Sequence, residues 1–159
     1  MTVFLLAFAP AGGAAAKTDA PQPLLWATVN VCDTVAHPDT VGIRGSMPGS
    51  GDPDEHMFMR IQLQYYALAD DSWHNIGPTG DTGFIAVGPG KYKARQAGRY
   101  FTVKPPATGS YTLRGAVTYE WRVNGDVVKR ARRRTTSGHG STSGADPRGF
   151  SAASCILKK

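Results

Sequence analysis

The chain has 159 residues, a formal net charge of +6 and 19% charged side chains. This length suits one domain, and the 41% of hydrophobic residues excludes an intrinsically disordered chain, which could not form a core. Nineteen glycines and eleven prolines favour many turns between short strands over long helices.

The first sixteen residues contain no charged side chain. Within them, an apolar stretch, Val3–Ala9, leads into the small residues Ala14–Ala16. This pattern is typical of the apolar core and cleavage site of a secretory signal peptide, and a disordered apolar tail is the alternative. The segment is too short and too rich in Gly and Pro for a stable membrane span. We therefore expect a signal peptide over 1–16, a secreted protein, and one domain over 17–159.

Two cysteines, Cys32 and Cys155, lie near the two ends of that domain, each in a strand-like context. An even number of cysteines behind an export signal favours a bridge, so we predict that Cys32 and Cys155 join the first strand to the last. Two buried thiols or a thiol–metal pair are the alternatives. Neither cysteine has a second Cys or His at ligand spacing, so we expect no metal there.

Two segments alternate between apolar and polar residues. In 57–65 the odd positions are apolar, from Met57 to Tyr65, and in 111–123 the apolar face runs from Tyr111 to Val123. This period of two predicts strands with one buried and one wet face, as in an antiparallel sheet.

The second of these segments ends in Asn124-Gly125, which is the strongest short signal for a hairpin because both positions tolerate a positive φ. A two-residue turn would set Glu120 opposite Lys129, which is a favourable pair. It would also set Arg130 opposite Tyr119, on the buried face. A bulge or a strand end near Lys129 would remove this conflict, so the register stays open.

Further strands are expected at 24–32, 41–47, 73–76, 83–87, 99–103 and 150–157, separated by turns rich in Pro, Gly and Asp. The Ser-, Thr- and Gly-rich stretch 135–149 is expected to be a mobile loop. No segment carries a helical apolar stripe. The predicted fold is an all-β, antiparallel β-sandwich of about seven to nine strands in one domain.

The Trp121-x-x-Asn124-Gly125 hairpin, the alternating strand before it and the late cysteine on a terminal strand resemble Ig-like and fibronectin-type-III-like sandwiches of secreted bacterial proteins. The resemblance covers most of the domain at the level of pattern. It implies an extracellular compartment and no particular activity. In antibody-type domains the two cysteines lie closer together in sequence, so that specific bridge is not implied.

A basic run follows the hairpin: Lys129, Arg130, Arg132, Arg133 and Arg134. On a strand, Arg130, Arg132 and Arg134 would project to one face, about 6 to 7 Å apart, which suits a repeating anionic polymer. The alternative is a strand edge that its charges protect from pairing with other chains.

Other candidate sites have weaker patterns. The loop 51–56 groups three carboxylates with His56, but it lacks the spacing of a calcium loop, so we expect a solvated acidic turn and no metal. The histidines and serines show no motif of a hydrolase, and no cofactor motif is present. Four aromatic residues could form a sugar-binding platform, with core packing as the alternative: Trp26, Tyr66, Trp73 and Tyr92.

From these patterns we expect an exported, non-catalytic binding or envelope-associated module whose partner is an anionic cell-envelope polymer or glycan, bound through the basic run. It would need no cofactor. A small secreted hydrolase or inhibitor on the same scaffold is the alternative, and a purely structural surface protein is a third.

Overall fold

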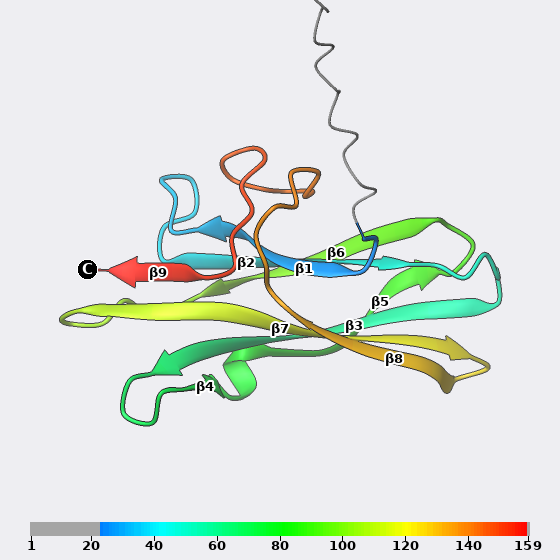
Figure 1. The fold of residues 1–159 in the computed structure, drawn as a ribbon, viewed down its shortest axis with the longest axis horizontal. Helices are drawn as coiled ribbons and strands as arrows, with labels where there is room; N and C mark the ends of the chain where they lie inside the picture. Colours follow the sequence, from blue (N-terminus) through cyan, green and yellow to red (C-terminus); the bar gives the residue numbers. More distant parts are fainter. Residues whose placement is uncertain (1–22, 159) are drawn as a thin grey trace, which may run out of the picture.

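The computed structural model describes residues 23–158, which form nine strands and a single 3₁₀ turn at Pro78–Gly80 (Figure 1). The predicted signal peptide over 1–16 and the start of the domain at 17 lie outside these residues. The strands are β1 (Trp26–Cys32), β2 (Thr40–Pro48), β3 (Glu55–Ala67), β4 (Ser72–Asn75), β5 (Asp81–Pro89), β6 (Ala94–Thr102), β7 (Ser110–Val123), β8 (Asp126–Arg134) and β9 (Cys155–Lys158).

The strands form two antiparallel sheets. The smaller sheet has the order β1-β2-β6. In the larger sheet β3 and β7 are the central strands; β4 and β5 pair with successive parts of β3, while β8 and β9 pair with successive parts of β7. The predicted all-β sandwich in a single domain is therefore confirmed. No helix among the described residues is long and apolar enough to cross a membrane.

The core comes from the alternation that the sequence predicts on the two central strands. Met57, Met59, Ile61 and Leu63 of β3 are buried between the sheets. The first three pair directly with the buried Trp121, Tyr119 and Val117 of β7. Leu113 of β7 is buried as well and pairs with Tyr65. The even-numbered residues of both strands therefore form the outer face of the larger sheet.

Two hydrogen bonds from β7 tie the sheets together. The hydroxyl of Tyr119 donates to the carbonyl of Trp26 at 2.6 Å, and the indole Nε1 of Trp121 donates to the carbonyl of Pro48 at 2.7 Å. Gly45 of β2 lies where the Tyr119 ring ends. A Cβ at this position would lie 2.8 Å from the Tyr119 hydroxyl, so β2 needs a glycine there. Both buried aromatic residues thus satisfy their polar atoms while they fill the core.

The disulfide joins the two sheets at one edge. Cys32 is the last residue of β1, Cys155 is the first residue of β9, and their Cα atoms lie 5.4 Å apart. The predicted bridge between the first and the last strand is confirmed.

Loop 135–149 is tied to the smaller sheet. The amide of Thr136 donates to Ala27, and that of Asp146 donates to Asn30. From β6, the Tyr100 hydroxyl donates to the carbonyl of Gly144 at 3.0 Å. Figure 1 shows this loop rising from the end of β8 beside β1. The expectation of a mobile loop overlooked these contacts, because they come from strands that are remote in the sequence.

Two strands differ most in extent from the prediction. Strand β6 begins at Ala94 rather than 99, because residues 94–98 pair with β2 in continuous register. The last strand is shorter than the predicted 150–157: β9 covers Cys155–Lys158, and Ala152 forms an isolated bridge with Val29.

Candidate anion-binding face of the larger sheet

A β-bulge fixes the register of the β7–β8 hairpin. Asn124 and Gly125 adopt φ angles of 52° and 89°, as the predicted turn requires. Arg122 pairs with Val127, whereas Trp121 pairs with Lys129, so β8 contains one extra residue. The sequence left the register open, and this bulge decides it.

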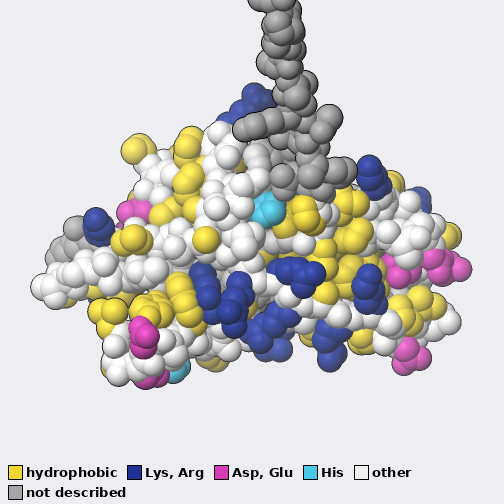
Figure 2. All heavy atoms as spheres, in the orientation of Figure 1, with side chains coloured by type: hydrophobic (Ala, Val, Ile, Leu, Met, Phe, Trp, Pro, Cys, Tyr) yellow, Lys and Arg dark blue, Asp and Glu magenta, His cyan; other side chains and the backbone are white. Residues whose placement is uncertain are grey.

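The bulge sets Arg130 opposite Glu120 and leaves Ala131 opposite Tyr119. The pairing of Glu120 with Lys129 that a plain two-residue turn would give is therefore wrong. Because Arg130, Arg132 and Arg134 all pair with even-numbered residues of β7, they lie on the outer face of the larger sheet. Figure 2 shows basic side chains gathered along β8.

Glu120 neutralises part of this basic face. Its side chain is only 1% exposed, and it accepts hydrogen bonds from Arg122 Nε at 2.9 Å and from Arg130 Nε at 2.8 Å. Burial raises the pKa of this carboxyl, but the hydrogen bonds from the two guanidinium groups outweigh burial, so the pKa lies below its ordinary value. Arg130 is thus half of an internal ion pair.

Three other arginines have no such partner. Arg114, Arg132 and Arg134 have no carboxylate within 4.0 Å among residues 23–158. They open onto a hollow of about 500 Å³ in the outer face, which we call the arginine depression. Its lining residues are Gln64, Trp73, Arg114, Arg132, Arg133, Arg134 and Thr136.

Arg114 is held at the place where the edge partner of β7 changes. Strand β8 pairs with β7 from Ala116 onward, β9 pairs with it up to Leu113, and Arg114 lies between them. Its Nε donates to Gln64 Oε1 at 3.0 Å, and its guanidinium carbon lies 4.0 Å from the centre of the Trp73 ring. The side chain is therefore oriented by a hydrogen bond on one side and by a cation–π contact on the other.

The arginine depression is a cluster of positive charges that no carboxylate of residues 23–158 compensates. Burial lowers the pKa of Arg114, and the charges of Arg134 and Arg132 lower it further. Like charges gathered without a counter-ion repel one another, and an anion bound among them would relieve this repulsion.

The five residues of the predicted basic run have different surroundings. Arg132, Arg133 and Arg134 line the arginine depression, and Arg133 also donates to the carbonyl of Arg132. Arg130 is paired with Glu120. Lys129 lies 4.8 Å from the centre of the Trp121 ring, on the other face of the strand. Arg114 and Gln64 are not among the predicted site residues, and their only signal in the sequence is their place on the polar faces of two alternating strands.

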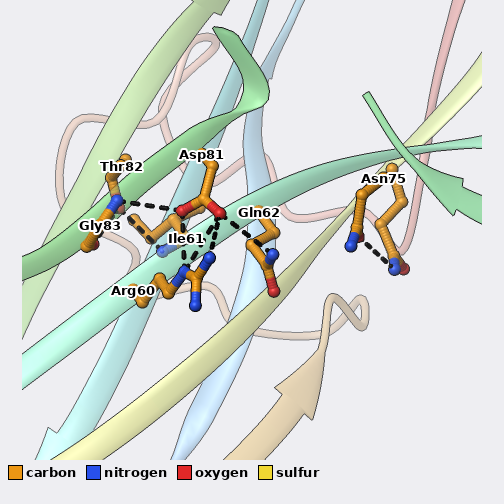
Figure 3. A network of polar contacts seen from close by, with 8 residues as sticks. Arg60, Ile61, Gln62, Asn75, Asp81, Thr82 and Gly83 are labelled. Atoms are coloured by element: carbon orange, nitrogen blue, oxygen red, sulfur yellow. Dashed lines mark hydrogen bonds and ion pairs between the residues drawn. The ribbon is translucent and has the colours of Figure 1, made fainter. Parts of the chain in front are cut away.

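A second hollow lies on the same outer face, around Asp81 (Figure 3). Asp81 accepts hydrogen bonds from Arg60 Nε at 2.9 Å, from Gln62 Nε2 at 3.1 Å and from the amide of Gly83 at 3.0 Å. The hydrogen bond from Arg60 is the main reason why the pKa of Asp81 falls to about 2. We call this hollow of about 450 Å³ the amide depression; it is lined by Arg60, Gln62, Asn75, Gly77, Pro78, Gly80, Asp81 and Gly83.

Comparison of the chain with protein-family models, with curated proteins and with solved structures finds no match in any of the three. The chemistry of these two hollows is therefore the basis for a functional proposal.

The histidine clusters lack the geometry of a hydrolase. Asp70 Oδ2 and Ser72 Oγ both approach Nε2 of His74, at 2.7 and 2.8 Å, so the ring does not stand between an acid and a nucleophile. The His139 ring stacks on Trp26 with 4.6 Å between ring centroids, and it contacts no carboxylate of the described residues.

The acidic loop 51–56 gathers no metal ligands: no group of three or more His, Cys, Asp or Glu within 23–158 is arranged to hold an ion. Asp52 and Asp54 are exposed, as expected of a solvated turn, but Glu55 is buried and accepts a hydrogen bond from the amide of Ser50.

The four candidate aromatic residues do not form one platform. Trp26 belongs to the smaller sheet, and Tyr92 lies in the turn between β5 and β6. Trp73 and Tyr66 do lie together on the larger sheet, with ring centroids 5.2 Å apart. Arg114 covers the Trp73 ring, so this pair acts as a support for the arginine rather than as a bare stacking surface.

Proposed function

We propose that this protein is an exported, non-catalytic binding module that holds an anionic polymer on the outer face of its larger sheet. The arginine depression would provide the site. The disulfide is consistent with an oxidising, extracellular compartment.

The observation that carries the proposal is that Arg114 lies on the central strand β7. Protection of a free strand edge accounts for basic residues on β8, which is the last strand of its row in the sheet. It does not account for Arg114, because β7 is a central strand. Arg114 lies on a central strand and lines the same hollow as Arg132 and Arg134 of the edge strand, with no carboxylate nearby in the described chain. This arrangement favours a ligand that supplies the negative charge.

The spacing of the cations favours a polymer over a single small anion. Arg132 and Arg134 are two residues apart on one face of a strand, which separates their Cα atoms by about 6.5 Å. Arg114 continues this basic surface onto β7. A chain with repeated negative groups could contact these arginines at the same time, and each contact would release counter-ions.

The test is a binding titration of polyphosphate at several salt concentrations. The triple variant Arg114→Gln, Arg132→Gln, Arg134→Gln should lower the salt dependence, with the slope of log K against log salt falling by about two. The matched control is Lys91→Gln, Lys93→Gln, Lys104→Gln, which removes the same charge from exposed positions elsewhere. A similar loss in both variants would mean that the net charge alone attracts the polymer, and would contradict the proposal.

A further inference from the structure

The side chain of Gln64, which lines the arginine depression, links the two hollows on the outer face. Its Nε2 donates to Asn75 Oδ1 at 3.0 Å, and its Oε1 accepts from Arg114 Nε at 3.0 Å. Asn75 lines the amide depression and Arg114 lines the arginine depression. Since Gln64 is only 7% exposed and is bonded on both sides, the two hollows form one fixed surface.

The register of the sheet gives the direction of this surface. Asp81 pairs with Gln62, Gln62 with Ala116, and Ala116 with Arg134. The surface thus runs across β5, β3, β7 and β8, a distance of three strand spacings or about 14 Å. Ala116, in the middle of this row, carries only a methyl group. Ala116 is only 1% exposed, so neighbouring side chains close over it, and a ligand that reaches from one hollow to the other would pass over them.

The amide depression differs from its neighbour in chemistry. Its one cation, Arg60, forms an ion pair with Asp81, so the pair has no net charge. Gln62 and Asn75 contribute amide groups, and three of the eight lining residues are glycines, which leave the backbone accessible. Paired carboxylates and amides are suited to hydroxyl groups, which can donate and accept at once.

A polymer with a negative charge on every unit would fit this hollow poorly. A phosphate placed there would lie near the carboxylate of Asp81 and be repelled by it. Arg60, the one cation of the lining, already pairs with that carboxylate. Hydroxyl groups would have no such penalty. The complementary ligand therefore has charged groups at one end of the surface and uncharged hydroxyl groups at the other.

We infer that the anionic polymer is an acidic polysaccharide that lies across the strands. Its carboxylate or sulfate groups contact Arg114, Arg132 and Arg134, and an adjoining uncharged part of the sugar chain occupies the amide depression. This inference rests on the proposed function, because it specifies the ligand of the same face.

The experiment compares three probes on the folded protein: hyaluronate, in which every second sugar is uncharged, polyphosphate and single-stranded DNA. The variant is Gln62→Ala, and the control is Thr108→Ala, an exposed position that lines neither hollow. Loss of the Gln62 amide should weaken hyaluronate binding about fivefold and leave polyphosphate binding unchanged, because Gln62 bonds to Asp81 and not to Gln64 or Arg114. The control should bind both as the parent protein does. If Gln62→Ala unfolds, Gln62→Met serves, because it keeps the length of the side chain and removes the amide.

Three outcomes separate this inference from the proposed function. A hyaluronate affinity that the Gln62 variant leaves intact overturns the inference. Tighter binding of polyphosphate or DNA than of hyaluronate, still dependent on Arg114, Arg132 and Arg134, also overturns it while the proposed function stands. Binding of every probe that survives loss of these arginines overturns the proposed function itself.

Discussion

Arg130 lies directly opposite Glu120, and its Nε donates to the buried carboxylate at 2.8 Å. Replacement of the acid by Glu120→Gln leaves Arg130 and Arg122 without their shared partner. We expect the free energy of unfolding to fall by about 1 to 3 kcal/mol, the range for a lost hydrogen bond to a charged group. The variant should also bind polyphosphate with a steeper salt dependence, since Arg130 becomes available.

Chemical denaturation and the salt titration described above measure both effects. Asp126→Asn is the matched control, because Asp126 is an exposed acid in the same hairpin and makes no ion pair with the described residues. A Glu120→Gln protein as stable as its parent would show that the two arginines find equivalent partners elsewhere.

The disulfide should supply a large part of the stability. It closes a loop of 123 residues, for which the chain-entropy account gives about 4 to 5 kcal/mol. The double variant Cys32→Ala, Cys155→Ala should lose this amount in the free energy of unfolding measured with denaturant. Reduction of the parent protein is the control, because it removes the same constraint without a change of side chain. A loss well below this range in both would indicate that the unfolded chain is already compact without the bridge.

Acid should destabilise the protein through Asp81. Its pKa lies at about 2 in the folded protein against an ordinary 3.8, so over this interval the unfolded chain binds more protons than the folded chain. The contribution is therefore fully present above about pH 4, and it is lost as the pH falls toward 2. Asp81→Asn should flatten this part of the stability curve.

The measurement is the free energy of unfolding at pH 5, 3 and 2, values chosen to bracket this interval. Asp54→Asn is the control, because Asp54 is an exposed carboxylate that makes no ion pair within 23–158. Curves for Asp81→Asn and the parent protein that run parallel through this range would show that Arg60 does not hold the carboxylate in solution as it does in the structure.

Much of the fold could be predicted because it depends on local patterns. The alternation in 57–65 and 111–123 reappears as β3 and β7, and Asn124-Gly125 turns the chain as expected. The register was harder, because a bulge changes which face a side chain occupies, and its place depends on the partner strand. Here the buried Tyr119 is matched by Ala131 rather than by a charged residue.

The candidate site could be predicted only in part. The basic run is contiguous in sequence, so its three outer arginines could be found by counting alternate positions. The contribution of Arg114 could not, because it reaches the same hollow from another strand, and Gln64 joins it from a third. Nor could the sequence show that Glu120 neutralises Arg130, whereas Arg132 and Arg134 pair with no acid in the described part of the chain.

The sequence by itself therefore determined the class of fold, the central strands, the hairpin turn and the cysteine pair, because periodicity, turn chemistry and cysteine number act over short stretches or as simple counts. The tertiary structure alone decided the register of β8, the attachment of loop 135–149 to the smaller sheet and the joining of two hollows through Gln64. These features depend on contacts between strands far apart in the chain, and such contacts exist only once the sheets have assembled.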